Sequence, residues 1–130
     1  MSEGIKMYGR SGGTKKTLPE NYNQNLLLET DFDGVHLAKG KWTANGFLIL
    51  KGSRVMQEYL GQNNVGLNSI LKELQEDNIT IEEYPYFILS QDIFLQSPST
   101  AARLVHGNSR TGFRDWKHDG ITLEQLIDNL

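Results

Sequence analysis

The stretch that decides the fold runs from Val35 to Leu50 and has the sequence VHLAKGKWTANGFLIL. Its first part, Val35 to Trp42, alternates apolar and polar residues, which is typical of a strand with one buried face. Asn45-Gly46 is a tight-turn dipeptide, and the apolar run Phe47 to Leu50 follows it. The sequence therefore predicts an antiparallel hairpin, which begins after a second turn dipeptide at Asp33-Gly34.

The chain beyond this hairpin predicts a helix and two short strands. Val55 to Leu60 fits either a short strand or a helical turn. An apolar stripe at helical spacing then predicts an amphipathic helix, and its members are Leu67, Ile70, Leu71 and Leu74. Tyr84 to Leu89 and Ile93 to Leu95 predict strands on either side of the polar turn Ser90-Gln91-Asp92.

The last part of the chain predicts two more helices with a strand between them. Ser97 is a favoured N-cap, Pro98 suits the first helical position, and Gly107 suits the C-terminal cap. Phe113 to Trp116 is aromatic enough for a strand, and Thr122 and Gln125 have the spacing of a capping box that starts the final helix. We predict an α+β fold, a small antiparallel sheet with about three helices in the order β-β-α-β-β-α-β-α. Residues 1–30 are expected to form a partly flexible N-terminal extension, and residues 31–130 a single domain.

Composition limits the classes of protein to which the chain can belong. The 130 residues are 38% hydrophobic, enough for one compact core. The absence of cysteine excludes disulfides, thiolate zinc sites and a cysteine nucleophile. No apolar run is long enough for a membrane span, and Met1-Ser2-Glu3-Gly4 lacks the basic start of a secretory signal. We therefore expect a cytoplasmic protein with no membrane partner and no cofactor.

Charge is distributed unevenly along the chain. The net charge of −3 does not favour nucleic acid for the whole molecule. Residues 73–92 contain acids but no basic residue, whereas residues 97–118 are mostly basic among their charged positions. A further basic cluster holds Lys39, Lys41, Lys51 and Arg54. The chain is polarised, so its total charge is a poor guide to any one face.

Three motifs occur in order along the chain: GFLILKGS at 46–53, FLQSPSTAA at 94–102 and GNSRTGFRDWK at 107–117. They resemble the GFxVLKGS, FxSPSxAA and GxSxNGWxxWK patterns of a bacterial domain-of-unknown-function family that occurs C-terminal to GIY-YIG nuclease domains. The second half also resembles the restriction-system adenine-methylase-associated (RAMA) domain. Thr111-Gly112-Phe113 departs from the usual Asn-Gly-Trp, and residues 1–30 contain no GIY-YIG nuclease. The resemblance implies association with restriction, modification or other DNA-handling systems.

Serines at a helix start and nearby basic residues give a physical route to phosphate binding. The N–H groups at a helix N-terminus accept anions, and arginine forks onto phosphates or base edges. The candidate nucleic-acid-binding residues are Lys51, Ser53, Arg54, Ser97, Ser99, Arg103, Arg110, Arg114 and Lys117. The structural alternative makes Ser97 only an N-cap, places Phe113 and Trp116 in the core and leaves the arginines solvated.

Catalytic and metal sites lack support in the sequence. The glycine-rich segment 9–17 does not have the spacing of a phosphate-binding loop and is expected to be a flexible segment. His36, His106 and His118 do not have the spacing of metal ligands, and no serine lies in a nucleophile elbow. We therefore expect a non-catalytic accessory module that binds DNA or RNA. The alternative is a protein-interaction or regulatory module, such as a free-standing bacterial or phage defence-related adaptor, whose acidic segment meets a basic partner. The sequence does not indicate an oligomeric state.

Overall fold

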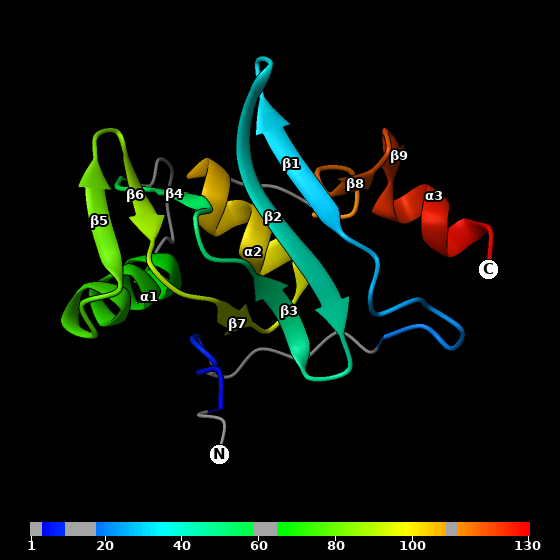
Figure 1. The fold of residues 1–130 in the computed structure, drawn as a ribbon, viewed down its shortest axis with the longest axis horizontal. Coiled ribbons are helices and arrows are strands. Elements are labelled where there is room, and N and C mark those ends of the chain that lie inside the picture. The colour runs from blue at the N-terminus through cyan, green and yellow to red at the C-terminus, as the bar shows by residue number, and fades with distance from the viewer. Residues whose placement is uncertain (1–3, 10–17, 59–64, 109–111) are drawn as a thin grey trace.

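The computed structural model describes residues 4–9, 18–58, 65–108 and 112–130. Within these ranges the chain forms two antiparallel sheets and three helices, which confirms the predicted α+β class (Figure 1). The glycine-rich segment from 10 onward, the end of the ambiguous stretch Val55 to Leu60, and Arg110 lie outside the described residues.

The larger sheet has six strands, and every neighbouring pair in it is antiparallel. Its spatial order is β7-β3-β2-β1-β8-β9. The bounds in chain order are β1 Leu28–Phe32, β2 Val35–Thr43, β3 Gly46–Ile49, β7 Ile93–Leu95, β8 Lys117–His118 and β9 Ile121–Thr122.

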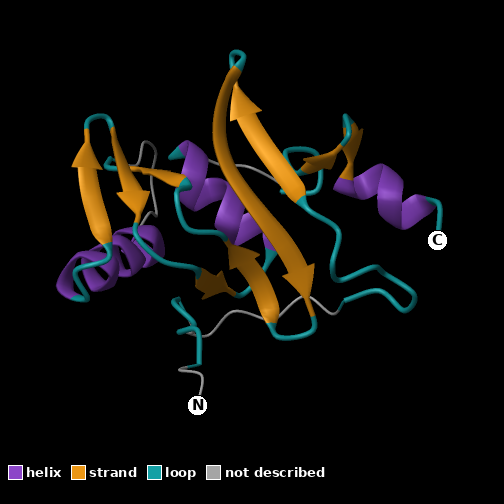
Figure 2. Cartoon of the chain, viewed as in Figure 1, coloured by secondary structure: helices purple, strands orange, loops and turns teal. Residues whose placement is uncertain are grey.

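The smaller sheet has the order β4-β6-β5, so β5 is an edge strand. Its strands are β4 Arg54–Met56, β5 Thr80–Glu83 and β6 Tyr86–Leu89. The helices are α1 Val65–Glu76, α2 Pro98–His106 and α3 Leu123–Asp128. Helix α2 packs behind β2, β3 and β7 and also contacts β4, whereas α1 lies at the β5–β6 end and α3 at the opposite end (Figure 2).

The predicted central hairpin is confirmed, but its turn lies one residue earlier than the sequence suggested. Thr43 pairs with Gly46, so the two turn residues are Ala44 and Asn45. Gly46 is the first residue of β3, where its φ is 137° and an added Cβ would lie 2.7 Å from the carbonyl oxygen of Leu95. Glycine is needed at position 46 because β3 and β7 approach each other closely there. The Asn45-Gly46 dipeptide therefore serves this strand packing as well as the turn.

Strands β1, β5 and β9 are absent from the predicted order. The stretch from Val55, left open between a strand and a helical turn, begins within strand β4. Asp33-Gly34 does form a turn, with φ values of 54° and 81°, and it joins β2 to the unpredicted strand β1. The pairing of β1 with β2 contains a bulge, beside which Leu37 and Ala38 are both buried. Strand β5 is mostly exposed and carries Glu82 and Glu83.

The three predicted helices are present with the expected ends. The apolar stripe of α1 is buried. At α2, the Ser97 hydroxyl accepts a hydrogen bond from the Thr100 N–H, and Gly107 closes the helix with a φ of 78°. At α3, Thr122 and Gln125 form the predicted capping box. These caps satisfy N–H and C=O groups that a helix end would otherwise leave unpaired.

The strand predicted at Phe113 to Trp116 is wrong, because these residues form a turn. The N–H groups of Asp115 and Trp116 both donate to the carbonyl oxygen of Gly112, at 3.3 and 3.1 Å. The next strand, β8, begins at Lys117. The aromatic content of this segment suggested a strand. In the structure Phe113 and Trp116 belong to the turn, and their side chains pack in the core. Trp116 lies 4.5 Å from Phe47 between ring centroids, and Phe113 lies 5.6 Å from Trp42.

The expected boundary at residue 30 does not coincide with a structural boundary. Strand β1 spans it, and both Tyr8 and Tyr22 are buried in the core. Tyr22 packs edge-on to Trp42 with centroids 5.4 Å apart, and burial raises the pKa of its hydroxyl to about 12. The described N-terminal residues therefore belong to the same folded unit as the rest.

Residues 4–9, here called the N-terminal strap, are tied to the end of α1. The Asp77 carboxylate accepts hydrogen bonds from the Lys6 ammonium at 2.8 Å and the Tyr8 hydroxyl at 2.5 Å. These two donors hold the pKa of Asp77 below its ordinary value, and Asp77 in turn raises the pKa of Lys6.

We expect Asp77→Asn to lower the melting temperature at neutral pH. A carboxylate whose pKa is depressed in the folded state adds stability above its unfolded pKa, and this contribution is lost as pH falls through the folded pKa. The difference between wild type and variant should therefore shrink as pH falls below the ordinary value of 3.8, and vanish only below the lowered pKa of the folded state. Thermal melts between neutral pH and about pH 2 test this. Glu76→Gln, at an exposed neighbouring position, serves as the control. A difference that persists in acid would contradict the ion-pair explanation.

Candidate nucleic-acid interface

The start of α2 is one of the predicted phosphate sites, and the turn formed by residues 112–116 packs against it. A Cβ at Gly112 would lie 2.5 Å from the backbone nitrogen of Ser99. The Trp116 indole Nε1–H also donates to the carbonyl oxygen of Pro98 at 3.0 Å. The turn that begins at Gly112 therefore covers part of the first turn of α2, and a phosphate would have to compete with this internal packing.

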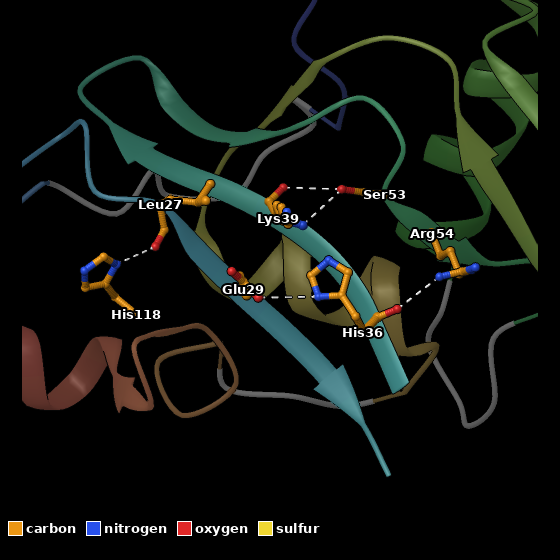
Figure 3. A network of polar contacts seen from close by, with 7 residues as sticks. All are labelled: Leu27, Glu29, His36, Lys39, Ser53, Arg54 and His118. Carbon is orange, nitrogen blue, oxygen red and sulfur yellow. Dashed lines mark hydrogen bonds and ion pairs between the residues drawn. The ribbon is translucent and has the colours of Figure 1, made fainter. Parts of the chain in front are cut away.

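The second predicted site, at Lys51, Ser53 and Arg54, joins the two sheets (Figure 3). Ser53 is buried, and its hydroxyl accepts from the Lys39 N–H at 3.1 Å and donates to the Lys39 carbonyl oxygen at 3.3 Å. The guanidinium of Arg54 donates to the carbonyl oxygen of His36 at 3.0 Å and lies 3.5 Å from Glu83. Lys51 is exposed, and its backbone N–H donates to Asp92. Ser53 and Arg54 thus have structural partners, whereas the Lys51 side chain faces solvent.

The remaining candidates lie on different elements. Arg103 is exposed on α2. Arg114 is exposed in the 112–116 turn, where its Nε lies 3.6 Å from Glu124. Lys117 is exposed on β8. The predicted residues therefore do not form one cluster, although all of the described ones except Ser53 keep some exposure.

The structure brings Lys117 together with two lysines that the sequence assignment left out. Lys39 on β2 pairs with Glu29 on β1, and Glu29 pairs with Lys117 on β8. Residues paired in this way project from the same face of a sheet. Lys41 lies two residues after Lys39 on β2 and shares that face. Lys39 and Lys117 therefore flank Glu29, and Lys41 lies farther along β2 on the same face.

This face continues into an apolar row, and none of the helices in the described ranges packs on it. Lys41 pairs with Leu48, and Leu48 pairs with Phe94; both apolar side chains are half-buried. Helix α2 packs on the opposite side of the sheet (Figure 1). We call this surface the open face; it consists of Glu29, Lys39, Lys41, Leu48, Phe94 and Lys117.

The signal that could have found Lys39 and Lys41 was present in the sequence. The alternation that predicted strand β2 places both lysines on the side opposite Gly40 and Trp42, which are buried. The other lysine, Lys117, comes from a segment 76 residues or more away in sequence, and only the pairing of β1 with β8 brings it to this face.

The histidines have three separate surroundings. His36 Nδ1 lies 3.6 Å from Glu29, and His118 Nδ1 is 2.8 Å from the carbonyl oxygen of Leu27 (Figure 3). His106 is buried, with its Nε2 2.8 Å from the Thr30 hydroxyl. Among the residues that the structure describes, no three histidine, aspartate or glutamate side chains gather in a way that could hold a metal ion.

The fold and this surface define the class of protein as an α+β domain with a six-stranded antiparallel sheet that α2 covers on one side. The chain belongs to the family described as a domain of unknown function, DUF4357, whose profile matches residues 16–127. No characterised protein and no solved structure matches the chain. None of the helices in the described ranges is long and apolar enough to cross a membrane.

Proposed function

We propose that this domain is a non-catalytic module that binds nucleic acid, with DNA as the expected ligand and the open face as the binding surface. The observation that supports the proposal is the set of lysines on one sheet face, the open face. Lys39 and Lys117 flank Glu29, and Lys41 extends the positive charge along β2. Lysines placed in this way can neutralise successive phosphates of a backbone that lies across the strands.

The shape of the open face favours a single strand over a duplex. The major groove of B-form DNA admits an α-helix or a two-stranded ribbon, which is narrower than this six-stranded sheet. Unstacked bases of a single strand, in contrast, can lie on apolar and aromatic side chains. Phe94 and Leu48 offer such half-exposed contacts beside Lys41. The lysines would then hold the phosphates while the apolar row contacts the bases.

A role beside DNA-handling enzymes is part of the same proposal. Its support is the likeness of the 46–53, 94–102 and 107–117 motifs to the domain that follows GIY-YIG nucleases and to the RAMA domain. The module would supply contact with nucleic acid to a restriction, modification or other DNA-processing system, and another polypeptide would supply the catalysis.

We expect the double variant Lys39→Ala/Lys117→Ala to bind single-stranded oligonucleotides more weakly than wild type. Each lysine that contacts a phosphate of a single strand contributes about 0.7 to the slope of log affinity against log salt. Fluorescence anisotropy titrations at several salt concentrations should therefore show a lower affinity and a shallower slope. The matched control is Lys72→Ala, because Lys72 is an exposed lysine on α1.

Two results would contradict the proposal. One is no binding of wild type to a single strand or a duplex at about 50 mM salt, where phosphate contacts are strong. The other is binding that both variants weaken equally, because the open face would then have no special part in it. The lysine changes are at surface positions, so unchanged melting temperatures would show that folding is intact.

A further inference from the structure

A second surface lies at the ends of the β1–β2 and β5–β6 hairpins, whose turns point the same way in Figure 1. Large apolar side chains are exposed on both hairpins. Phe32 and Val35 are 56% and 52% exposed, and Ile81 and Tyr84 are 55% and 72% exposed. Single exposed apolar residues are common in proteins, but a group of this kind typically marks a contact surface.

Arg54 holds the two hairpins beside each other. Its guanidinium donates to the carbonyl oxygen of His36 at 3.0 Å and lies 3.5 Å from Glu83. His36 follows Val35, and Glu83 precedes Tyr84. The apolar residues of the two hairpins are therefore close enough for one partner to contact both. We call this surface, made of Asp31–Val35 and Ile81–Tyr84 with Arg54 between them, the two-hairpin end.

The charge of the two-hairpin end is acidic. Asp31, Asp33, Glu82 and Glu83 are exposed there. Neither Leu28 to Ala38 nor Thr80 to Leu89 contains a lysine or an arginine. The one arginine between the hairpins is engaged with His36 and Glu83. A ligand for this surface must therefore be apolar and positively charged, which is the opposite of a nucleic acid.

The sheet order adds a backbone feature to this chemistry. Among the described residues, β5 is an edge strand with β6 as its one strand partner, and its other side offers backbone groups to an extended segment. Acidic side chains on an edge discourage pairing between two copies, since like charges would meet. The same side chains attract a segment that carries lysine or arginine.

We infer that the two-hairpin end is a docking surface for a partner protein that presents an extended segment with basic residues among apolar ones. Phe32 and Ile81, one on each hairpin, are the apolar contacts, and Asp31 and Glu82 select the charge. Asp31 projects from the same side of β1 as Glu29, and the other residues of this surface are separate from the open face. A partner and a nucleic acid could therefore be bound at the same time.

The test is selection of a displayed library of random peptides, about twelve residues long, on the full chain. An extended peptide of this length reaches about 40 Å, at about 3.3 Å per residue. The library is first depleted on the variant Phe32→Ser/Ile81→Ser. We expect the selected peptides to be enriched in lysine or arginine and in apolar residues. A labelled copy of the most enriched peptide should then bind the variant at least about tenfold more weakly, as for loss of central contacts.

Two further variants decide whether the contact is specific. Asp31→Lys/Glu82→Lys should weaken binding of the selected peptide, whereas Leu130→Ser should not, although Leu130 is 58% exposed. No enrichment, enrichment of acidic or purely polar peptides, or equal binding by all variants would overturn the inference. Self-association of wild type that these variants abolish would also overturn it, because the occupant would then be a second copy. Unchanged melting temperatures show that each variant is folded.

Discussion

Gly112→Ala is expected to destabilise the domain strongly. Gly112 has a φ of 82°, and a Cβ there would lie 2.5 to 2.6 Å from backbone atoms of Pro98 and Ser99. The left-handed conformation and the forced separation of α2 from the 112–116 turn together should cost about 2–5 kcal/mol. Urea unfolding followed by tryptophan fluorescence measures this loss.

The matched control for this change is Gly120→Ala. Gly120 has a φ of 81°, nearly the same as Gly112, but a Cβ there meets nothing within 4 Å. Its substitution should cost only the conformational part, about 1–2 kcal/mol. The difference between the two variants isolates the close approach to α2. Equal losses would show that this approach contributes nothing to stability.

Trp116→Ala is expected to have an effect of similar size. Trp116 is fully buried, stacks against Phe47 at 4.5 Å between centroids, and donates its indole N–H to the carbonyl oxygen of Pro98. Removing a buried ring of this size typically costs about 3–5 kcal/mol. The remaining tryptophan, Trp42, lets the same fluorescence measurement follow unfolding.

Trp116→Phe separates the hydrogen bond from the packing. Phenylalanine keeps an aromatic ring against Phe47 but leaves the Pro98 carbonyl without its indole donor, so the expected loss is smaller, about 1–3 kcal/mol. A variant as unstable as Trp116→Ala would assign most of the effect to the hydrogen bond. A variant as stable as wild type would show that neither the bond nor the ring size matters.

The packing of Gly112 and Trp116 also shows what the sequence motifs contribute to the fold. Pro98, Ala101 and Ala102 are buried in α2, and the small side chains allow the helix to pack closely on the sheet. Gly112 and Trp116 then fix the following turn against the first turn of that helix. The residues that carry the family resemblance in this part of the chain are mainly structural, so the motifs identify a fold more directly than a binding site.

The elements that could be predicted from the sequence are those with strong local signals. The β2–β3 hairpin has alternation and a turn dipeptide, and α2 and α3 have caps at the expected positions. Strands β1 and β5 lacked such signals. Acidic residues occupy the exposed side of both, and these strands are stabilised by pairing with β2 and β6, which local sequence does not show.

The candidate site was less predictable, because closeness along the chain was a poor guide to closeness in space. Ser53 and Arg54 were grouped with Lys51, yet the first is buried against Lys39 and the second links two hairpins. The row of Lys39, Glu29 and Lys117 depends on long-range strand pairing. Such pairing is determined by the whole core and by no single segment of it.

The N-terminal strap has a consequence for how the limits of this domain are defined. The family profile begins at residue 16, but residues 6–8 hydrogen-bond to Phe94 along the outer side of β7, and Tyr8 is almost fully buried. The strap thus shields the edge strand β7 of the six-stranded sheet from pairing with a neighbouring molecule. A polypeptide limited to residues 16–127 would lose that shield together with a core tyrosine. We therefore expect solubility, as well as stability, to depend on residues that lie outside the shared family region.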